Sequence, residues 1–498
     1  MSDYVLAIDQ GTTNTKALAL DASARVVASF SVPTPIAYPR PGWVEQSGTE
    51  IWRATRDAIE GCRSRLPEGA RFAAIAISNQ RETVGLWRRS TGETIGPCVT
   101  WQCRRSTDLL DAIRTPENAE RVEALTGLGL DPLFPAAKLA WLLDAYPDAR
   151  RLAADGDLCA GTMDSWLLFN LTGGAVHATD ASNASRTQLF DIHAQSWSAE
   201  LAALFGVPLG ILPEVRDSNA LFGLVVGAGP APEGAPVGAM IGDSHAALFG
   251  HGVRKPGAVK ATYGTGSSLM TLTEKPLRSR AGLSTTVAWR RSGEVAYALE
   301  GNISVSAQAA AWMAELLGLR DTAALTELAA SATGSSGISF VPALAGLGAP
   351  YWRPRARAAL TGMSLATSRA EIARAALEAI AHQIADVFAA MEQDLGAPLA
   401  KLSVDGGATR NGLLMQWQAD LVGRPVRRVS LPELSAFGAG AMAGIGCGLF
   451  DEAVAAARVA EGEDEIAPHI AEAEREPKRR AWSAAVQSVI ETASHLGT

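Results

Sequence analysis

The chain has 498 residues, which is long for a single hydrophobic core and favours two or more domains. Hydrophobic residues make up 47% of the chain and charged residues 19%, a composition that excludes an intrinsically disordered protein. With a net charge of −8 and no basic stretch, we expect no nucleic-acid partner, so an anionic ligand must be held by local groups.

The cysteine pattern and the apolar runs bear on the compartment. The five cysteines include no CxxC pair, which predicts neither a zinc site nor a disulfide framework and fits a reducing cytoplasm. Asp3 and Asp9 argue against a signal peptide. The uncharged run 434–450 is short for a membrane span and rich in glycine and alanine, so it predicts a tightly packed buried helix. We expect a cytoplasmic protein with no membrane partner.

The N-terminal segment reads as strands joined by a polar turn. Residues 4–9 and 16–21 predict two strands around the turn 10–15, and 26–32 predict a third. A helix should begin near Ser47, because Ser47 and Glu50 have the spacing of a capping box.

The same strand–turn–strand unit recurs in the second half. Residues 258–263 and 268–273 predict strands around the turn 264–267, which suggests an internal duplication. Further on, Ser368 and Glu371 predict another helix start, and a short strand at 402–404 precedes a helix from about Asn411. Alternating strands and helices predict an α/β protein with two domains, 1–250 and 251–498, whose boundary lies near residues 247–257.

The turn after the first strand has the residue types that bind phosphate. Gly11 allows close backbone approach, and Thr12 and Thr13 offer hydroxyl and amide donors. Lys16 adds a positive charge, whereas Asp9 beside phosphate implies Mg²⁺. The alternative interpretation is an ordinary hairpin turn.

Two later segments fit the same chemistry. Gly264 and Thr265 lie in the turn of the second unit, and Gly406 and Gly407 lie between a strand and a helix, where α/β sheets accept nucleotides. For both segments the alternative is a plain connection. The chain contains no GxxxxGK[ST] sequence, which excludes a P-loop enzyme.

Polar residues at two other strand ends could bind an alcohol. Arg81 and Glu82 can donate to and accept from vicinal hydroxyls, although adjacent ions more often form a surface pair. Trp101 could pack on a carbon chain or lie in the core. Asp243 follows the apolar run 237–241 and could accept a hydroxyl proton during phosphoryl transfer, or could cap a helix.

These motifs, in this order, resemble the FGGY carbohydrate kinases. They are DQGTT at Asp9, NQRET at Asn79 and WQCRR at Trp101, followed by DASNASRT, GDSHAALFG, TYGTG, GLGAPYW and DGGATRNGLLMQ. The similarity runs along nearly the whole chain, and within the family it is strongest to glycerol kinases.

The resemblance implies an actin-like ATPase (ribonuclease H-like) fold whose two domains flank a nucleotide cleft, with ATP and Mg²⁺ as cofactors. It implies that Asp243 is the general base and that Asp9, with Asp243, supports the metal. The implied substrate-binding residues are Arg81, Glu82, Trp101, Asp243 and Ser244. The implied ATP-binding residues are Thr12, Thr13, Lys16, Gly264, Thr265, Gly406, Gly407 and Asn411. We also expect a homo-oligomer, a dimer or a tetramer.

This chain departs from the glycerol-kinase pattern at several of its positions. Leu133 replaces a tyrosine, Ser268 a phenylalanine and Ser244 a glutamine, which predicts a wider pocket with different hydrogen bonds. Lys16 replaces an arginine and keeps its charge. On the nucleotide side, Ala307 and Ala311 replace glycine and glutamine.

The functional hypothesis is ATP-dependent phosphorylation of a primary hydroxyl of glycerol or of a related small polyol or sugar. One alternative is a kinase for a larger polyol or a ketose, such as a tetritol, a pentitol or a xylulose-like sugar. Another is a non-metabolic actin-like ATPase, which the same fold permits but which has no need for an Arg–Glu pair and a tryptophan at the site.

Overall fold

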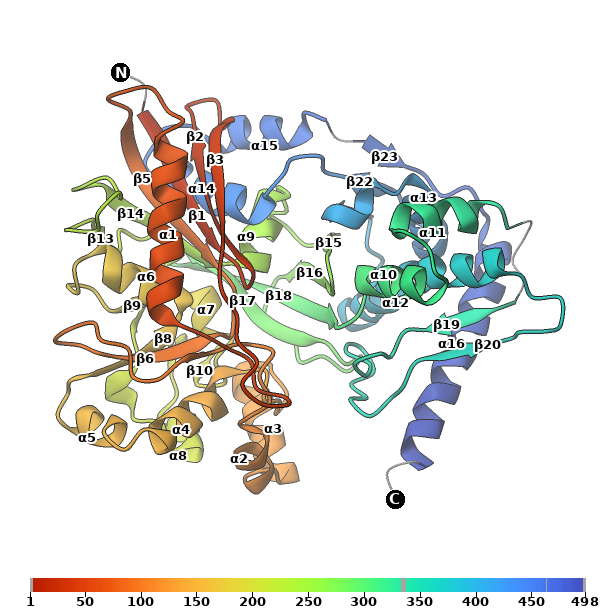
Figure 1. Ribbon diagram of the computed structural model, residues 1–498, viewed down its shortest axis with the longest axis horizontal. Coiled ribbons are helices and arrows are strands. Elements are labelled where there is room, and N and C mark those ends of the chain that lie inside the picture. The colour runs from red at the N-terminus through yellow and green to blue at the C-terminus, as the bar shows by residue number, and fades with distance from the viewer. Residues whose placement is uncertain (1–2, 333–336, 463, 496–498) are drawn as a thin grey trace.

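The computed structural model describes residues 3–332, 337–462 and 464–495. Figure 1 shows two lobes, one containing the N-terminus and the other the C-terminal helix, each with helices around a mixed sheet. The predicted α/β architecture with two domains is confirmed.

The N-terminal sheet has six strands. Their spatial order, with bounds, is β13 (Gly223–Leu224), β14 (Pro236–Gly242), β5 (Arg71–Asn79), β1 (Asp3–Gln10), β2 (Asn14–Leu20) and β3 (Val26–Pro33). β14, β5 and β1 run parallel, whereas β13, β2 and β3 join by antiparallel pairing.

The C-terminal sheet has seven strands and repeats this plan. Their order is β23 (Asp464–Ile466), β22 (Val426–Arg428), β21 (Lys401–Asp405), β15 (Ala258–Tyr263), β16 (Ser267–Thr273), β18 (Glu294–Ile303) and β17 (Ser284–Arg291). The directions of its first six strands match those of the N-terminal sheet one for one, and β17 is the addition. The two sheets therefore have the topology expected of a duplicated unit.

Smaller elements surround these sheets. A four-stranded sheet has the order β4 (Glu45–Gln46), β7 (Cys98–Val99), β6 (Val84–Arg88) and β8 (Leu158–Thr162). Three strand pairs are β9 (Ala178–Asp180) with β12 (Glu214–Arg216), β10 (Phe190–Asp191) with β11 (Ser196–Trp197), and β19 (Ser339–Val341) with β20 (Ala359–Thr361).

The helices up to residue 250 include α1 (Gly48–Arg63), α2 (Thr107–Ala112), α3 (Pro116–Thr126), α4 (Pro135–Ala145), α5 (Ala149–Ala154), α6 (Met163–Leu171), α7 (Ala181–Ala184), α8 (Ala199–Phe205) and α9 (Asp243–Gly250). The later ones include α10 (Ala307–Leu316), α11 (Thr322–Ala330), α12 (Arg369–Leu395), α13 (Gly412–Val422), α14 (Leu434–Gly446), α15 (Glu452–Ala460) and α16 (Glu472–His495).

The central strand β1 is buried on both faces, which explains its continuous apolar sequence. Leu6 and Ile8 lie in one core with residues of α1, whereas Val5 and Ala7 lie in another with residues of α14. Because side chains alternate along a strand, Asp9 follows Ala7 onto the α14 side.

Helix α14 belongs to the C-terminal part of the chain but packs against β1 and β5 of the N-terminal sheet and against α9. A Cβ added to Gly438 would lie 1.9 Å from the carbonyl oxygen of Ala246 in α9. Only a glycine allows such close contact between the helices, so the predicted role of the small-residue run in tight packing is confirmed. Figure 1 shows α14 beside β1 in the lobe that holds the N-terminus.

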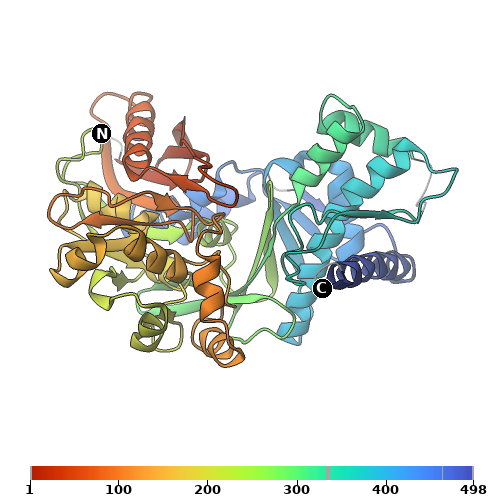
Figure 2. The same ribbon diagram turned by 60° about the horizontal axis from the view of Figure 1, so that its bottom comes forward.

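The predicted helix starts are also observed. Ser47 and Ser368 cap α1 and α12, and the second forms the full capping box with Glu371. Figure 2 shows α16 on the lobe away from the N-terminus. Within the part of the chain that the structure describes, none of the helices combines the length and apolarity needed to span a membrane.

Candidate active site

Asp9 lies at the end of β1, next to Lys16 on the paired strand β2. Its carboxylate accepts a hydrogen bond of 3.0 Å from the Ser78 hydroxyl. Burial, followed by the negative charge of Asp243, raises the pKa of Asp9 to about 6. The two carboxylates that the resemblance assigns to the metal therefore repel each other, although they come from opposite ends of the N-terminal half.

Asp243 is the first residue of α9, directly after β14. Its Oδ1 accepts from the Arg81 Nε at 2.9 Å and from the Ser244 amide at 2.6 Å. A Cβ on Gly242 would lie 2.8 Å from Cδ of Arg81, so a glycine here lets the arginine pass beneath the helix start. The Asp243 side chain remains 37% exposed, which leaves Oδ2 open to an incoming hydroxyl group.

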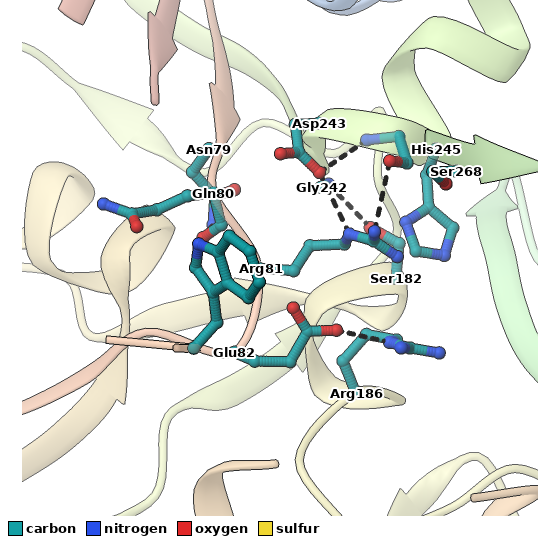
Figure 3. Close-up of polar contacts among 12 residues, drawn as sticks. Asn79, Gln80, Arg81, Glu82, Ser182, Arg186, Gly242, Asp243, His245 and Ser268 are labelled. Atoms are coloured by element: carbon teal, nitrogen blue, oxygen red, sulfur yellow. Dashed lines mark hydrogen bonds and ion pairs between the residues drawn. The ribbon is translucent and has the colours of Figure 1, made fainter. Parts of the chain in front are cut away.

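Arg81 and Glu82 are both buried, and they do not pair with each other. The Arg81 Nη1 donates to Glu300 at 2.6 Å, and the Glu82 carboxylate accepts from the Arg186 Nε at 2.7 Å. The Arg186 Nη2 lies 2.8 Å from the second oxygen of Glu300. We call the five residues Asp243, Arg81, Glu300, Arg186 and Glu82 the acid–arginine row. Figure 3 shows Arg81 reaching Asp243 at one end of the row, and Glu82 facing Arg186 at the other.

Trp101 lies on the loop after β7 and is 38% exposed. Its indole N–H donates to the Thr12 hydroxyl at 2.9 Å, and that hydroxyl in turn donates to Gln80 at 3.1 Å. The predicted acceptor-side tryptophan thus contacts the predicted phosphate turn directly. This contact involves residues 89 positions apart, and no sequence pattern indicated it.

The other predicted residues of the first turn differ in their surroundings. Thr13 is exposed at the tip between β1 and β2. Lys16, in contrast, forms an ion pair of 2.5 Å with Glu433, the residue that precedes α14. Glu433 has a φ of 58°, in the left-handed region that favours glycine.

The second predicted phosphate turn joins β15 to β16. Thr265 is exposed at its tip, and the backbone amide of Gly264 donates to the carbonyl of Gly266 at 3.0 Å. The Gly264 carbonyl accepts from the amide of Ala307, the first residue of α10, and the Thr265 carbonyl accepts from the amide of Ser306, the N-cap of that helix. Ala307 therefore contacts the turn through its backbone.

The third glycine segment lies beside the second turn. A Cβ on Gly406, whose φ is 99°, would lie 2.4 Å from the carbonyl oxygen of Tyr263, so the two segments touch. Gly407 opens a short 3-10 helix, Gly407–Arg410, between β21 and α13, and α13 follows its cap Asn411 close to where the sequence predicted a helix start. Asn411 caps α13 and also donates to Thr326 at 2.9 Å.

Of the positions that depart from the glycerol-kinase pattern, the three on the acceptor side lie close to the acid–arginine row. Ser244 accepts from the Arg81 Nη2 at 3.1 Å, and Ser268 donates to Glu300 at 3.3 Å. The backbone of Leu133 is tied to that of Glu82 by Lys138, whose buried ammonium donates to both carbonyls. Burial lowers the pKa of Lys138 to about 7.

Sequence reasoning missed Glu300, Arg186 and Lys138. Arg186 belongs to the DASNASRT motif, but nothing local indicated its partners. Glu300 is an acidic residue on β18, and its neighbours Ala298, Leu299 and Gly301 are all buried. An ionisable residue inside such a strand needs an opposite charge nearby, which was the available signal.

The chain is similar to known proteins along nearly its whole length. The N-terminal domain model of the FGGY family of carbohydrate kinases matches residues 4–250, and its C-terminal domain model matches residues 259–447. An apulose kinase of Pectobacterium atrosepticum is 50% identical over 88% of this chain and 89% of its own. A glycerol kinase of Geobacter sp. is 44% identical over 97% and 98% of the two chains.

Solved structures agree. The glycerol kinase of Plasmodium falciparum with ADP superimposes with a TM-score of 0.92 at 30% identity, over 98% of each chain. The xylulose kinase of Rhodospirillum rubrum gives a TM-score of 0.86 at 26% identity, over 99% of this chain and 100% of its own. The predicted actin-like fold is thereby confirmed. This chain belongs to the FGGY family of carbohydrate kinases and is a phosphotransferase that acts on a carbohydrate.

Proposed function

We propose that this kinase transfers the γ-phosphoryl group of ATP to a primary hydroxyl of a ketose larger than glycerol. The observation that carries the proposal is the replacement of two large side chains by Ser244 and Ser268. Their hydroxyls contact Arg81 and Glu300. Small hydroxyl-bearing residues here leave more room and offer more hydrogen-bond partners to a polyhydroxylated acceptor than a glutamine and a phenylalanine would.

Two relatives support a ketose. The Pectobacterium protein is named apulose kinase and the Rhodospirillum protein xylulose kinase, and both names denote ketoses. ATP as the donor is supported by the ADP in the superimposable Plasmodium enzyme.

In the reaction, an acceptor oxygen bonds to the γ-phosphorus while the bond from that phosphorus to ADP breaks. Asp243 takes the acceptor proton through Oδ2, because Arg81 and the Ser244 amide occupy Oδ1. Arg81, Glu82 and Trp101 orient the acceptor, and the turns with Thr12, Thr13 and Lys16, and with Gly264 and Thr265, hold the phosphates. Gly406 contacts Tyr263 at the start of the second turn, and with Gly407 and Asn411 it binds the nucleoside end of ATP.

Asp9 and Asp243 fit a magnesium ion. The charge of Asp243 contributes to the raised pKa of Asp9, so a cation near both carboxylates would relieve their repulsion. Mg²⁺ commonly binds to one or two carboxylates together with the phosphates of a nucleotide. When bound, the ion would neutralise phosphate charge during transfer.

A screen of ADP release tests the proposal. The purified enzyme is assayed with ATP and Mg²⁺ on pentuloses, tetritols, pentitols, dihydroxyacetone and glycerol. We expect the highest kcat/KM on a pentulose, above the values for both glycerol and dihydroxyacetone. A kcat/KM for glycerol that exceeds that of every ketose would refute the proposed acceptor while leaving the kinase chemistry intact.

Glycerol is the second candidate, and one observation favours it. The Geobacter glycerol kinase aligns with this chain over nearly its full length, and Arg81, Glu82, Trp101 and Asp243 fit the glycerol-kinase pattern here. The same screen separates the two acceptors.

A further inference from the structure

Glu300 occupies the centre of the acid–arginine row and is fully buried. One carboxylate oxygen accepts from Arg81 at 2.6 Å, and the other lies 2.8 Å from the Arg186 Nη2. Burial alone would raise the pKa of Glu300, but the positive charges of Arg186 and Arg81 hold it well below its usual range. The carboxylate is therefore ionised, and it is the shared counter-charge of both arginines.

Each of these arginines has a second carboxylate on its other side. Arg81 donates through Nε to Asp243 at 2.9 Å, and Arg186 donates through Nε to Glu82 at 2.7 Å. Charges thus alternate along the row from the proposed base to the proposed acceptor-binding glutamate. A guanidinium is planar, so fixing one edge of it also fixes the direction of the other donors.

The members of the row come from different parts of the fold. Arg81, Arg186 and Asp243 follow or begin elements of the N-terminal half, whereas Glu300 lies on β18 of the C-terminal sheet. On the same strand, Ile303 lies against the second phosphate turn, because a Cβ on Gly266 would be 2.5 Å from its carbonyl oxygen. The carboxylate that holds both arginines is thus built into the scaffold of the predicted nucleotide side.

We propose that Glu300 is a positioning residue that aligns the acceptor-binding carboxylates, Asp243 and Glu82, with the nucleotide-binding half of the enzyme. It acts through Arg81 and Arg186 and touches no substrate itself. The proposal rests on the proposed acceptor-binding role of Asp243, Arg81 and Glu82, but not on which carbohydrate binds there. Without Glu300 the acceptor hydroxyl is misaligned, and water competes with it for the phosphoryl group of ATP.

The test compares Glu300→Gln with Glu294→Gln, an exposed glutamate at the start of the same strand. We expect E300Q to lower kcat for acceptor phosphorylation about 100-fold, because small misplacements of reacting groups have effects of this size. The KM for ATP should stay within about twofold, since no nucleotide-binding residue is changed. The molar ratio of ADP released to acceptor phosphorylated should be about one in the wild-type enzyme, where ATP cleavage and transfer are coupled. In E300Q this ratio should rise severalfold. E294Q should match the wild type in all three quantities.

Arg186→Lys gives an independent test if E300Q does not fold. Lysine keeps the charge but cannot reach Glu82 and Glu300 at once with a planar fork. We expect a higher KM for the acceptor and the same excess of ADP release. Glu300→Asp should recover part of the lost transfer, because it restores the charge at shorter reach.

The ratio of ADP released to acceptor phosphorylated decides between a positioning role and a purely structural role for Glu300. If E300Q or R186K lowers acceptor phosphorylation and ATP hydrolysis by the same factor, or changes only the KM for ATP, Glu300 is a structural residue and the proposal is wrong. The assay uses whichever carbohydrate the wild type prefers. A preference for glycerol would thus overturn the proposed acceptor without affecting this test.

Discussion

The indole nitrogen of Trp101 lies 2.9 Å from the hydroxyl oxygen of Thr12, and this hydrogen bond joins the acceptor side of the site to the first phosphate turn. The orientation of the Thr12 hydroxyl is then fixed, because it donates to Gln80 while it accepts from the indole. A residue chosen from the sequence for its ring therefore also orients a predicted phosphate ligand.

Replacing Trp101 by Phe should weaken acceptor and nucleotide binding together. Phenylalanine keeps an aromatic face but removes the donor, and one hydrogen bond contributes about 1 kcal/mol, or about fivefold in an equilibrium. We expect both KM values to rise by about this factor. A double-mutant cycle with Thr12→Val measures the coupling free energy between the two residues. For the KM for ATP, this coupling should be nearly as large as the effect of Trp101→Phe alone. Independent, additive effects would contradict the contact's role.

Asp243→Asn should reduce kcat by about 10³-fold, because an amide cannot take the acceptor proton. The variant should remain folded, since Arg81 keeps Glu300 as its partner. Isothermal titration with the preferred carbohydrate should still detect binding. Full activity of this variant would disprove the assignment of the base.

Asp9→Asn should change stability in a pH-dependent way. The pKa of Asp9 is about 6 in the folded protein against 3.8 in an unfolded chain, so the folded state binds more protons between these values. Stability contributed by the protonated form is therefore lost as pH rises from about 4 to 6. Above pH 6, without nucleotide or Mg²⁺, the variant should be more stable than the wild type by about 1–3 kcal/mol, and near pH 4 the two should agree.

Denaturant titrations at pH 4, 5, 6 and 7.5 provide the measurement for Asp9. Asp57→Asn serves as the control, because Asp57 is an exposed helix residue. A constant difference between the wild type and D9N at every pH would show that Asp9 has an ordinary pKa.

The double change Ser268→Phe with Leu133→Tyr should move the preference toward glycerol. The ring at position 268 fills space beside Glu300 and removes a hydroxyl partner, and the tyrosine narrows the side nearest Glu82. The ratio of kcat/KM for glycerol to that for the best ketose should rise about tenfold or more. Ser267→Ala, whose hydroxyl instead bonds Ser306, should leave the ratio unchanged.

Gly438→Ala should destabilise the protein by about 3 kcal/mol or more, because its Cβ would overlap the backbone of α9. The activity should fall as well, since α9 carries Asp243. Gly446→Ala is the matched control at the end of the same helix, where a Cβ meets open space, and it should leave stability unchanged or raise it by about 0.5 kcal/mol. Thermal melts of both variants provide the comparison.

The sequence identified those parts of the fold and site that depend on local pattern. The strand around Leu6 and the caps at Ser47 and Ser368 follow from spacing and hydrogen-bonding chemistry within a few residues. The motifs at Asp9 and Asp243 could be singled out because each places an acid at a strand end.

Partnerships across the chain could not be predicted in this way. The adjacency of Arg81 and Glu82 suggested a mutual pair, yet burial gives each a distant partner of opposite charge. Lys16 was assigned to phosphate on its charge, and only the packing of α14 shows that Glu433 also competes for it. Such pairings are fixed by three-dimensional packing between distant segments, which the local sequence around each residue does not reveal.

The return of α14 to the N-terminal sheet has a consequence for how the protein is made. Residues of α14 cover Val5 and Ala7 on one side of the first sheet. During synthesis α14 leaves the ribosome late, after every strand of the second sheet except β23. Until then the first sheet has an uncovered apolar face, which is a site for chaperone binding or aggregation. A fragment that stops at residue 250 would keep that face exposed permanently, so the N-terminal half should be insoluble when expressed alone and recoverable when co-expressed with the remainder.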